Sequence, residues 1–166
     1  MKKKLGTLLL TALLIFSCSD NRTAEEMFED AGQLYEEQKF ERAVKTYAKL
    51  SETYPDDPLA VKASYRMAEI YGGDLQDFES SIERYTFIAE KYPSHRDAPK
   101  ARFMAGYTLA NIVGDHERAK EQYDRFIRDY PEHDLAESVK FELRNLGKSL
   151  DQIEELENIM KNTPDE

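Results

Sequence analysis

The dipeptide Tyr-Pro occurs three times in this chain, and successive copies are 38 residues apart, at Tyr54-Pro55, Tyr92-Pro93 and Tyr130-Pro131. A fixed period of this length is typical of solenoids built from repeated helical hairpins. A single hairpin cannot bury its apolar face alone, so neighbouring hairpins stack against one another. The period therefore predicts an all-α, elongated protein with an extended binding surface.

The repeat extends well beyond the Tyr-Pro dipeptide. Steps of 38 residues align five further columns of similar side chains: Ala43, Ser81 and Ala119; Tyr47, Tyr85 and Tyr123; Leu50, Ile88 and Phe126; Ala60, Ala98 and Ala136; and Tyr65, Phe103 and Phe141. Within one copy, Ala43, Tyr47 and Leu50 lie at positions i, i+4 and i+7 and form one apolar stripe of a helix. The small residues allow paired helices to approach closely, and the aromatic residues fill the space between hairpins.

Proline and capping residues mark the ends of the predicted helices. Tyr54 precedes a proline and is biased away from helical backbone angles, and the proline lacks the N–H that a continuing helix needs. Asp57 and Pro58 are predicted to start the next helix, as its N-cap and its first residue. Asp134, with Glu137 three residues later, has the spacing of a capping box.

The turns are marked by glycine and by polar side chains. Turns inside the hairpins are predicted at Gly72-Gly73-Asp74 and at Gly114-Asp115, where glycine ends one helix and Asp115 caps the next. Between hairpins, His95 and His133 occupy the place that Asp57 holds in the first copy. We expect this column to supply a polar turn residue or cap.

The small-residue and aromatic columns resemble the tetratricopeptide (TPR) family, although the family's period is shorter, at about 34 residues. The resemblance implies a right-handed solenoid of about three and a half hairpins, with the 38-residue period, over residues 24–147. Its full hairpins are expected to start near Ala24, Asp57 and Asp97. The first helix of a fourth hairpin is expected from Leu135 to Leu146. Residues 148–166 are expected to form a C-terminal capping helix and a frayed tail.

The first residues of the chain resemble the signal peptide of a bacterial lipoprotein. Three lysines precede a short apolar stretch, and Ile15-Phe16-Ser17-Cys18 resembles the lipobox at which such leaders are cleaved. The apolar stretch is too short to span a bilayer. The resemblance implies that residues 1–17 are removed, that Cys18 carries diacylglycerol and further acyl lipid, and that residues 18–23 form a short tether. The alternative is an ordinary secreted protein with one unpaired cysteine.

Sorting rules of two-membrane bacteria retain a lipoprotein in the inner membrane when aspartate follows the lipidated cysteine. Ser19 stands at that position, so we expect a lipid-anchored protein of the outer membrane that faces the periplasm. Removal of residues 1–17 would leave 20 basic and 33 acidic residues, a net charge of −13. This charge argues against nucleic acid as a partner and against a polybasic contact with anionic lipid.

The sequence offers no constellation for catalysis or for metal binding. Its three histidines, His95, His116 and His133, form no i, i+4 pair and no H-E-x-x-H motif, and the single cysteine is assigned to the lipid. There is no G-x-S-x-G motif and no phosphate-binding glycine loop. We therefore expect a protein that is not an enzyme and that binds neither a metal nor a cofactor other than its covalent lipid.

In the TPR family, the first helix of each hairpin lines a concave groove that binds partners. The resemblance implies that this groove contains Gln33, Glu36, Lys62, Tyr65, Glu69, Lys100, Phe103 and Tyr107. Tyr65 and Phe103 belong to a repeat column, which leaves core packing and partner binding open for both. Tyr107 has Glu69 at the comparable place in the preceding copy and is the best candidate for an aromatic anchor.

The stretch from Tyr92-Pro93 through Ala98 and Ala101 to Phe103 fits the pattern Y-P-x-x-x-x-A-x-x-A-x-[YF], which resembles the BamD group of outer-membrane lipoproteins. Members of that group help a β-barrel machine to fold and insert outer-membrane proteins, and they usually have more hairpins than this chain. The resemblance implies a scaffold that binds extended or helical segments of cell-envelope proteins. Two alternatives stay open: a Tol–Pal-type coordinator of cell division that regulates peptidoglycan enzymes, and a pilotin that escorts secretin pores.

Overall fold

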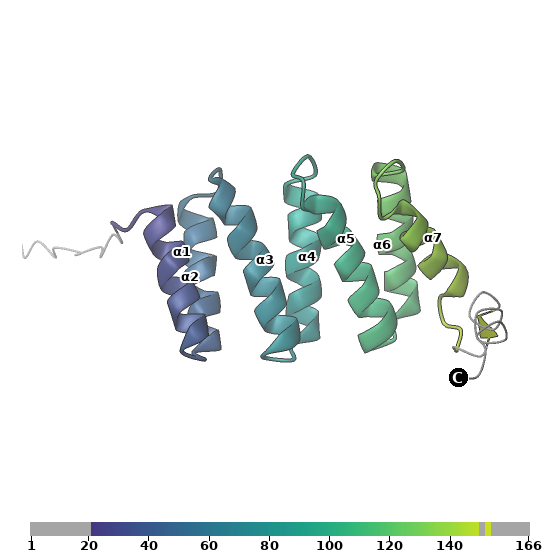
Figure 1. The fold of residues 1–166 in the computed structure, drawn as a ribbon, viewed down its shortest axis with the longest axis horizontal. Helices are drawn as coiled ribbons and strands as arrows, with labels where there is room; N and C mark the ends of the chain where they lie inside the picture. Colours follow the sequence, from purple (N-terminus) through teal and green to yellow (C-terminus); the bar gives the residue numbers. More distant parts are fainter. Residues whose placement is uncertain (1–20, 150–151, 154–166) are drawn as a thin grey trace, which may run out of the picture.

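The computed structural model describes residues 21–149 and 152–153. Within this part of the chain, seven α-helices lie side by side along the molecule (Figure 1). They are α1 (Ala24–Glu36), α2 (Phe40–Thr53), α3 (Pro58–Gly73), α4 (Phe78–Lys91), α5 (Ala98–Thr108), α6 (His116–Asp129) and α7 (Ala136–Asn145), and α5 continues into the π-helical turn η1 (Leu109–Val113). The predicted leader, Cys18 and most of the predicted capping helix at 148–166 lie outside the described residues.

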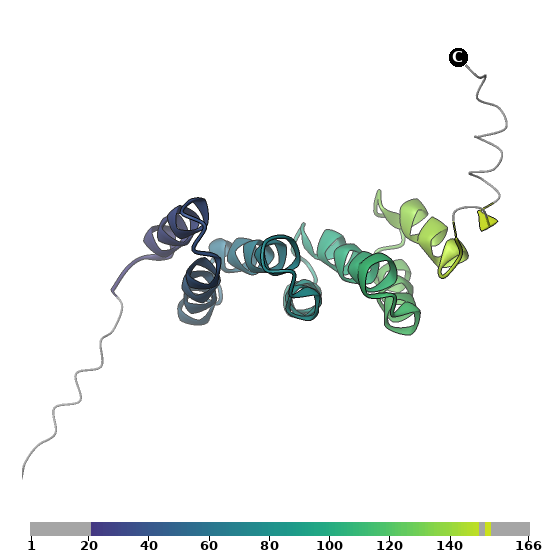
Figure 2. The ribbon, with the colours of Figure 1, turned by 90° about the horizontal axis from the view of Figure 1, so that it is seen from below.

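The helices form three hairpins, α1–α2, α3–α4 and α5–α6, and α7 is the first helix of a fourth. Viewed from below, the odd-numbered helices form one row and the even-numbered helices form a second row (Figure 2). Each helix packs chiefly against its neighbours in the sequence. The arrangement confirms the predicted fold class, a TPR-like solenoid of about three and a half hairpins.

The Tyr-Pro turns join each hairpin to the one before it. The hydroxyls of Tyr92 and Tyr130 donate hydrogen bonds of 3.0 and 3.2 Å to the proline carbonyl of the preceding Tyr-Pro turn. Tyr54 lies in the first such turn and donates to the carbonyl of Arg22 at 2.6 Å. The tyrosine of each turn thus contacts backbone that lies one repeat earlier, which explains why the dipeptide recurs with the period of the fold.

A polar side chain two residues after each proline of these turns holds the start of the next helix. The Asp57 carboxylate accepts the backbone N–H of Leu59 at 2.7 Å. In the later copies, the Nδ1 atoms of His95 and His133 accept the N–H group two residues on, at 3.2 and 3.1 Å. The predicted column of polar turn residues is therefore confirmed, and both imidazoles act as structural acceptors.

The capping box predicted at Asp134 and Glu137 is wrong. Leu135 is the N-cap of α7, and no side chain caps that helix. The N–H of Leu135 is already bonded to the ring of His133, and Glu137 forms an ion pair with Lys140 at 2.7 Å. The histidine turn shifts the start of the helix by one residue, so the spacing of the two acidic residues no longer fits a cap.

The turns inside the hairpins pass through one left-handed residue per repeat. Gln38, Gln76 and Gly114 have φ angles of 56°, 54° and 78°. These positions are themselves 38 residues apart, so the backbone conformation follows the period even where glycine is absent. At the third turn, Gly114 ends η1 and Asp115 caps α6 by accepting the N–H of Arg118, as predicted.

The turn predicted at Gly72-Gly73-Asp74 starts only at Asp74, because Gly72 and Gly73 are the last two residues of α3. Asp74 is the C-cap of this helix, and its N–H donates to the carbonyl of Ile70. A Cβ on Gly72 would lie 2.9 Å from the Oγ of Ser81, so glycine at this position lets α3 and α4 approach closely. Glycine serves close packing as well as turns, and the sequence pattern does not separate these two uses.

In each hairpin an aromatic ring of the first helix contacts an aromatic ring of the second. The ring centroids are 5.2 Å apart for Phe28 and Tyr47, 5.3 Å for Tyr65 and Tyr85, and 6.2 Å for Phe103 and Tyr123. The second member of each pair is a buried tyrosine of the even-numbered helix. Tyr123 is fully buried, and a Cβ on Gly106 would come within 2.6 Å of its ring. Glycine in α5 therefore leaves the space that this ring occupies.

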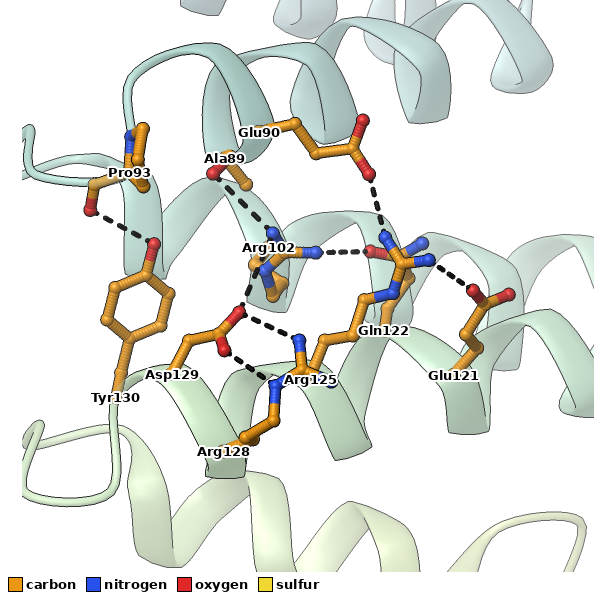
Figure 3. Close-up of polar contacts among 10 residues, drawn as sticks. All are labelled: Ala89, Glu90, Pro93, Arg102, Glu121, Gln122, Arg125, Arg128, Asp129 and Tyr130. Atoms are coloured by element: carbon orange, nitrogen blue, oxygen red, sulfur yellow. Dashed lines mark hydrogen bonds and ion pairs between the residues drawn. The ribbon is translucent and has the colours of Figure 1, made fainter.

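A buried arginine connects three helices in the second half of the solenoid (Figure 3). Arg102 of α5 donates through Nη1 to the Oε1 of Gln122 in α6 at 3.2 Å, and through Nη2 to the carbonyl of Ala89 in α4 at 3.5 Å. The Asp129 carboxylate lies 4.0 Å from Nη2 and supplies the opposite charge. Repeat spacing gave no sign of this network, because Ser64 occupies the Arg102 position in the preceding copy.

Replacement of Tyr123 tests the packing of the ring. Tyr123→Ala should lower the free energy of unfolding by about 3–5 kcal/mol, because it leaves a large cavity beside Gly106. Tyr123→Phe should leave that free energy nearly unchanged, since the buried Tyr123 hydroxyl has no hydrogen-bond partner among the described residues. Chemical denaturation measures both values, and a large loss in the phenylalanine variant would contradict an unpartnered hydroxyl.

Tyrosine burial also predicts how stability depends on alkaline pH. Burial raises the pKa of Tyr85 to about 12 and also raises the pKa of Tyr65 and Tyr123. Unfolded tyrosines ionise at about pH 10, so above this pH the unfolded state loses protons that the folded state keeps. The free energy of unfolding should therefore fall as pH rises, by about 1.4 kcal/mol per pH unit for each protected tyrosine. Denaturant titrations at a series of pH values above about 10 measure how steeply the free energy of unfolding falls with pH. Tyr85→Phe should make this fall less steep, and an unchanged pH dependence would show that Tyr85 is not protected from ionisation in the folded state.

Candidate partner-binding face

Three hollows lie along the surface formed by α1, α3, α5 with η1, and α7, which we call the odd-helix face. The first hollow, between α1 and α3, has a volume of about 630 Å³. The second, which α1, α3 and α5 line, has about 400 Å³, and the third, between α5 and α7, has about 550 Å³. These volumes are in the range of sites that bind small ligands or parts of a partner chain.

The second hollow brings together four of the predicted groove residues, Lys62, Tyr65, Glu69 and Lys100. The Nζ of Lys100 lies 5.2 Å from the centre of the Tyr65 ring, a cation–π contact between α5 and α3. Glu69 forms an ion pair with Arg66 at 2.9 Å. The hollow thus presents two lysines around one half-buried tyrosine.

Tyr65 and Phe103 both contribute to packing. They are half-buried, and each contacts the buried tyrosine of its own hairpin, Tyr85 or Tyr123. Tyr65 also lines the second hollow, whereas Phe103 lines none of the three. Phe103 instead contacts the ring of Tyr107, with centroids 6.0 Å apart. The column is therefore shared between the core and the surface, and Phe103 supports the side chain next to it.

Tyr107 is 39% exposed and lines the third hollow together with Phe141 of α7 and Leu146 beyond it. Two further apolar side chains, Ile112 and Val113 of the adjoining η1, are 51% and 40% exposed. The repeat pattern gave no signal for these two residues. In the described part of the chain the π-helical turn that carries them is found in the third hairpin alone.

The first hollow was not predicted as a unit. Its lining includes three aromatic and three acidic side chains, Phe28, Tyr35, Tyr47, Glu36, Glu69 and Asp74. The Asp74 carboxylate beside Tyr35 raises the pKa of the Tyr35 hydroxyl. Phe28 and Tyr35 fall outside the 38-residue columns, so the period could not single them out. Gln33, predicted at the groove, does not line this hollow, and its Nε2 donates to the Oε1 of Glu37 at 3.5 Å.

In residues 21–149 and 152–153, no group of three histidine, cysteine, aspartate or glutamate side chains could hold a metal ion. His95 and His133 cap turns, and His116 begins α6, where its ring packs beside Gly147. The same residues include no helix with the length and apolar character needed to cross a bilayer.

Comparison with known proteins gives one informative result. A search of curated proteins returned no match. A family model described as YfiO, outer membrane lipoprotein, matches residues 20–161, which include all seven helices. Because this match covers most of the chain, the protein belongs to the YfiO (BamD) family of outer membrane lipoproteins, the group that its Tyr-Pro repeat resembles.

Proposed function

We propose that this protein is a non-enzymatic scaffold that binds segments of cell-envelope proteins during the assembly of outer-membrane proteins. Its membership of a family of outer membrane lipoproteins supports this setting. The observation that carries the proposal is the row of three hollows on the odd-helix face, with the exposed Tyr107 at one of them. A helical solenoid with such a face can bind an extended or helical segment of another chain.

Charge on the odd-helix face changes along the molecule. The first hollow has Glu36 and Asp74 among its lining residues, whereas the second has Lys62 and Lys100. Complementary charge contributes more to specificity and to the rate of association than to raw affinity. A partner segment that follows the face would therefore carry basic side chains at the α1 end and acidic side chains over α3 and α5.

We further propose that a lipid on Cys18 tethers the protein to the outer membrane, with the helices on the periplasmic side. The lipobox-like Ile15-Phe16-Ser17-Cys18 supports this proposal. Several acyl chains on one residue exceed what stable anchoring requires. Helix α1 begins at Ala24, so only a short tether separates the lipid from the solenoid.

Substitution of Cys18 tests the anchor. Cys18→Ala should abolish the incorporation of labelled palmitate and remove the protein from the outer-membrane fraction, because no thiol remains for the lipid. Ser19→Asp is a matched variant that keeps the thiol; by the sorting rule it should keep the label and move the protein to the inner membrane. Normal labelling and normal fractionation of Cys18→Ala would refute the lipid anchor.

Photocrosslinking from position 107 in living cells tests the scaffold function. We expect the crosslinked product to contain a component of the β-barrel assembly machine or a nascent outer-membrane protein. The same crosslinker at Phe87, which is 36% exposed on α4 of the opposite row, is the control and should not give this product. Capture of a cell-wall synthase, a Tol–Pal component or a secretin from position 107 would replace the assembly role by one of the two alternatives.

Tyr107→Ala separates binding from folding. Because the Tyr107 side chain is exposed at the third hollow, its removal should leave the melting temperature nearly unchanged and weaken binding of the partner identified by crosslinking. Thermal unfolding and pull-down of that partner measure the two effects. A large drop in melting temperature would assign Tyr107 to the core.

A further inference from the structure

We infer that the first hollow of the odd-helix face binds one basic side chain, a lysine or an arginine, of a partner segment. The inference rests on the proposed scaffold function and names the chemistry of one contact within it. The hollow is lined from α1, α2 and α3, and its volume of about 630 Å³ admits a long side chain together with its flanking backbone.

The charge of the hollow favours a cation. Glu36, Glu69 and Asp74 line it, against one basic side chain, Arg66. The Nη1 of Arg66 is paired with a Glu69 oxygen at 2.9 Å, so this positive charge is balanced within the protein. The carboxylates of Glu36 and Asp74 remain as the excess charge that an incoming ammonium or guanidinium would meet, and an anionic group would be repelled.

The hydroxyl of an otherwise buried tyrosine opens onto the hollow and supplies a second, independent indication of a polar ligand. Tyr47 is only 3% exposed and lines the hollow, with its hydroxyl 3.8 Å from the position of a Cβ on Gly32. Among the described residues no hydrogen bond to this hydroxyl is found, and it is not one of the fully buried atoms without a partner, so it is accessible from the hollow that Tyr47 lines. Burial raises the pKa of Tyr47, so its oxygen stays protonated and neutral and can still accept a hydrogen bond. A purely apolar ligand would leave it unsatisfied, whereas a cationic N–H group would satisfy it.

The walls of the hollow match the rest of a lysine or arginine side chain. Phe28 and Tyr35 contribute aromatic surface, and Tyr35 is held by a ring contact with Phe40, with centroids 5.5 Å apart. Long basic side chains bury their alkyl stems against apolar surface and keep the charged group near polar atoms. Aromatic faces add a cation–π attraction to a nearby ammonium or guanidinium.

The other two hollows lack this combination. The second is lined by three basic side chains, Lys62, Arg66 and Lys100, against two acidic ones, Glu69 and Asp97, so its net charge does not favour a cation. The third contains one acidic side chain, Glu142, together with Lys148. In the described part of the chain, no three acidic side chains converge closely enough for a metal ion, so an organic cation, which needs no such cluster, fits the first hollow better. Among the three hollows of the odd-helix face, the preference for a basic side chain is thus confined to the first.

Binding of two matched peptides to the detergent-solubilised, full-length protein tests this inference. The probes are fluorescently labelled, end-capped alanine peptides that carry one central arginine or, as the neutral isostere, one central citrulline. The arginine peptide should bind about five-fold more tightly or better, the factor of a partly exposed ion pair, and the preference should shrink with added salt. The double variant Glu36→Gln with Asp74→Asn should abolish the preference, whereas Glu137→Gln on α7 should keep it.

Tyr47→Phe tests the hydroxyl separately. It should weaken binding of the arginine peptide by about five-fold or more, because a hydrogen bond to a charged group is lost. Tyr123→Phe is the matched control, since its buried hydroxyl lies outside the three hollows, and it should leave peptide binding unchanged. Circular dichroism should show that both variants stay folded.

Three results would overturn the inference: equal affinity for the two peptides, no saturable binding of the arginine peptide, or a preference that survives in the double variant. Crosslinking from position 107 is independent of these outcomes. Capture of an envelope partner without any arginine preference would reject the basic contact and keep the scaffold function. Failure of both experiments would reject the scaffold function itself.

Discussion

The packing of one buried tyrosine ring in each hairpin is the interaction on which the solenoid depends. Tyr47, Tyr85 and Tyr123 each contact an aromatic side chain of the first helix and fill the space between the paired helices. Removal of such a ring costs about 3–5 kcal/mol, against about 1 kcal/mol for a hydrogen bond such as those at the Tyr-Pro turns. Each ring pair therefore contributes more to the stability of its hairpin than the turn hydrogen bonds do, and the turns fix the spacing between hairpins.

Much of this fold could be predicted from the sequence, because its strongest contacts repeat at a fixed interval. The buried tyrosines form a repeat column. The polar turn residues also recur, as Asp57, His95 and His133, and the cap at Asp115 stands at a clear helix boundary. Predictions failed where one residue type has two uses. Gly72 was predicted in a turn because glycine is common there, but in the structure it lets two helices pack closely. Glu137 has the spacing of a capping residue, but its side chain pairs with Lys140.

The candidate site was harder to predict than the fold, because it depends on what differs between the copies. Lys62, Tyr65, Glu69 and Lys100 could be placed together from the repeat register, and the structure brings them to one hollow. The first hollow combines Phe28 and Tyr35, which lie outside the columns, with carboxylates from two helices. Such a combination becomes visible only when the distances between helices are known. The result is an acidic hollow at the α1 end followed by a more basic one, and this difference gives an otherwise regular face a direction.

The bond from Tyr54 to the carbonyl of Arg22 bears on how the protein would stand on a membrane. It holds the segment before α1 at the edge of the solenoid that carries the Tyr-Pro turns (Figure 1). An extended chain covers about 3.5 Å per residue, so the step from Cys18 to Arg22 spans at most ~14 Å. With a lipid on Cys18, that edge would stay close to the bilayer while the helices extend away from it. The exposed Ile112 and Val113, at the opposite edge, would then lie about one helix length farther out, roughly 20 Å, where a partner need not touch the membrane to reach them.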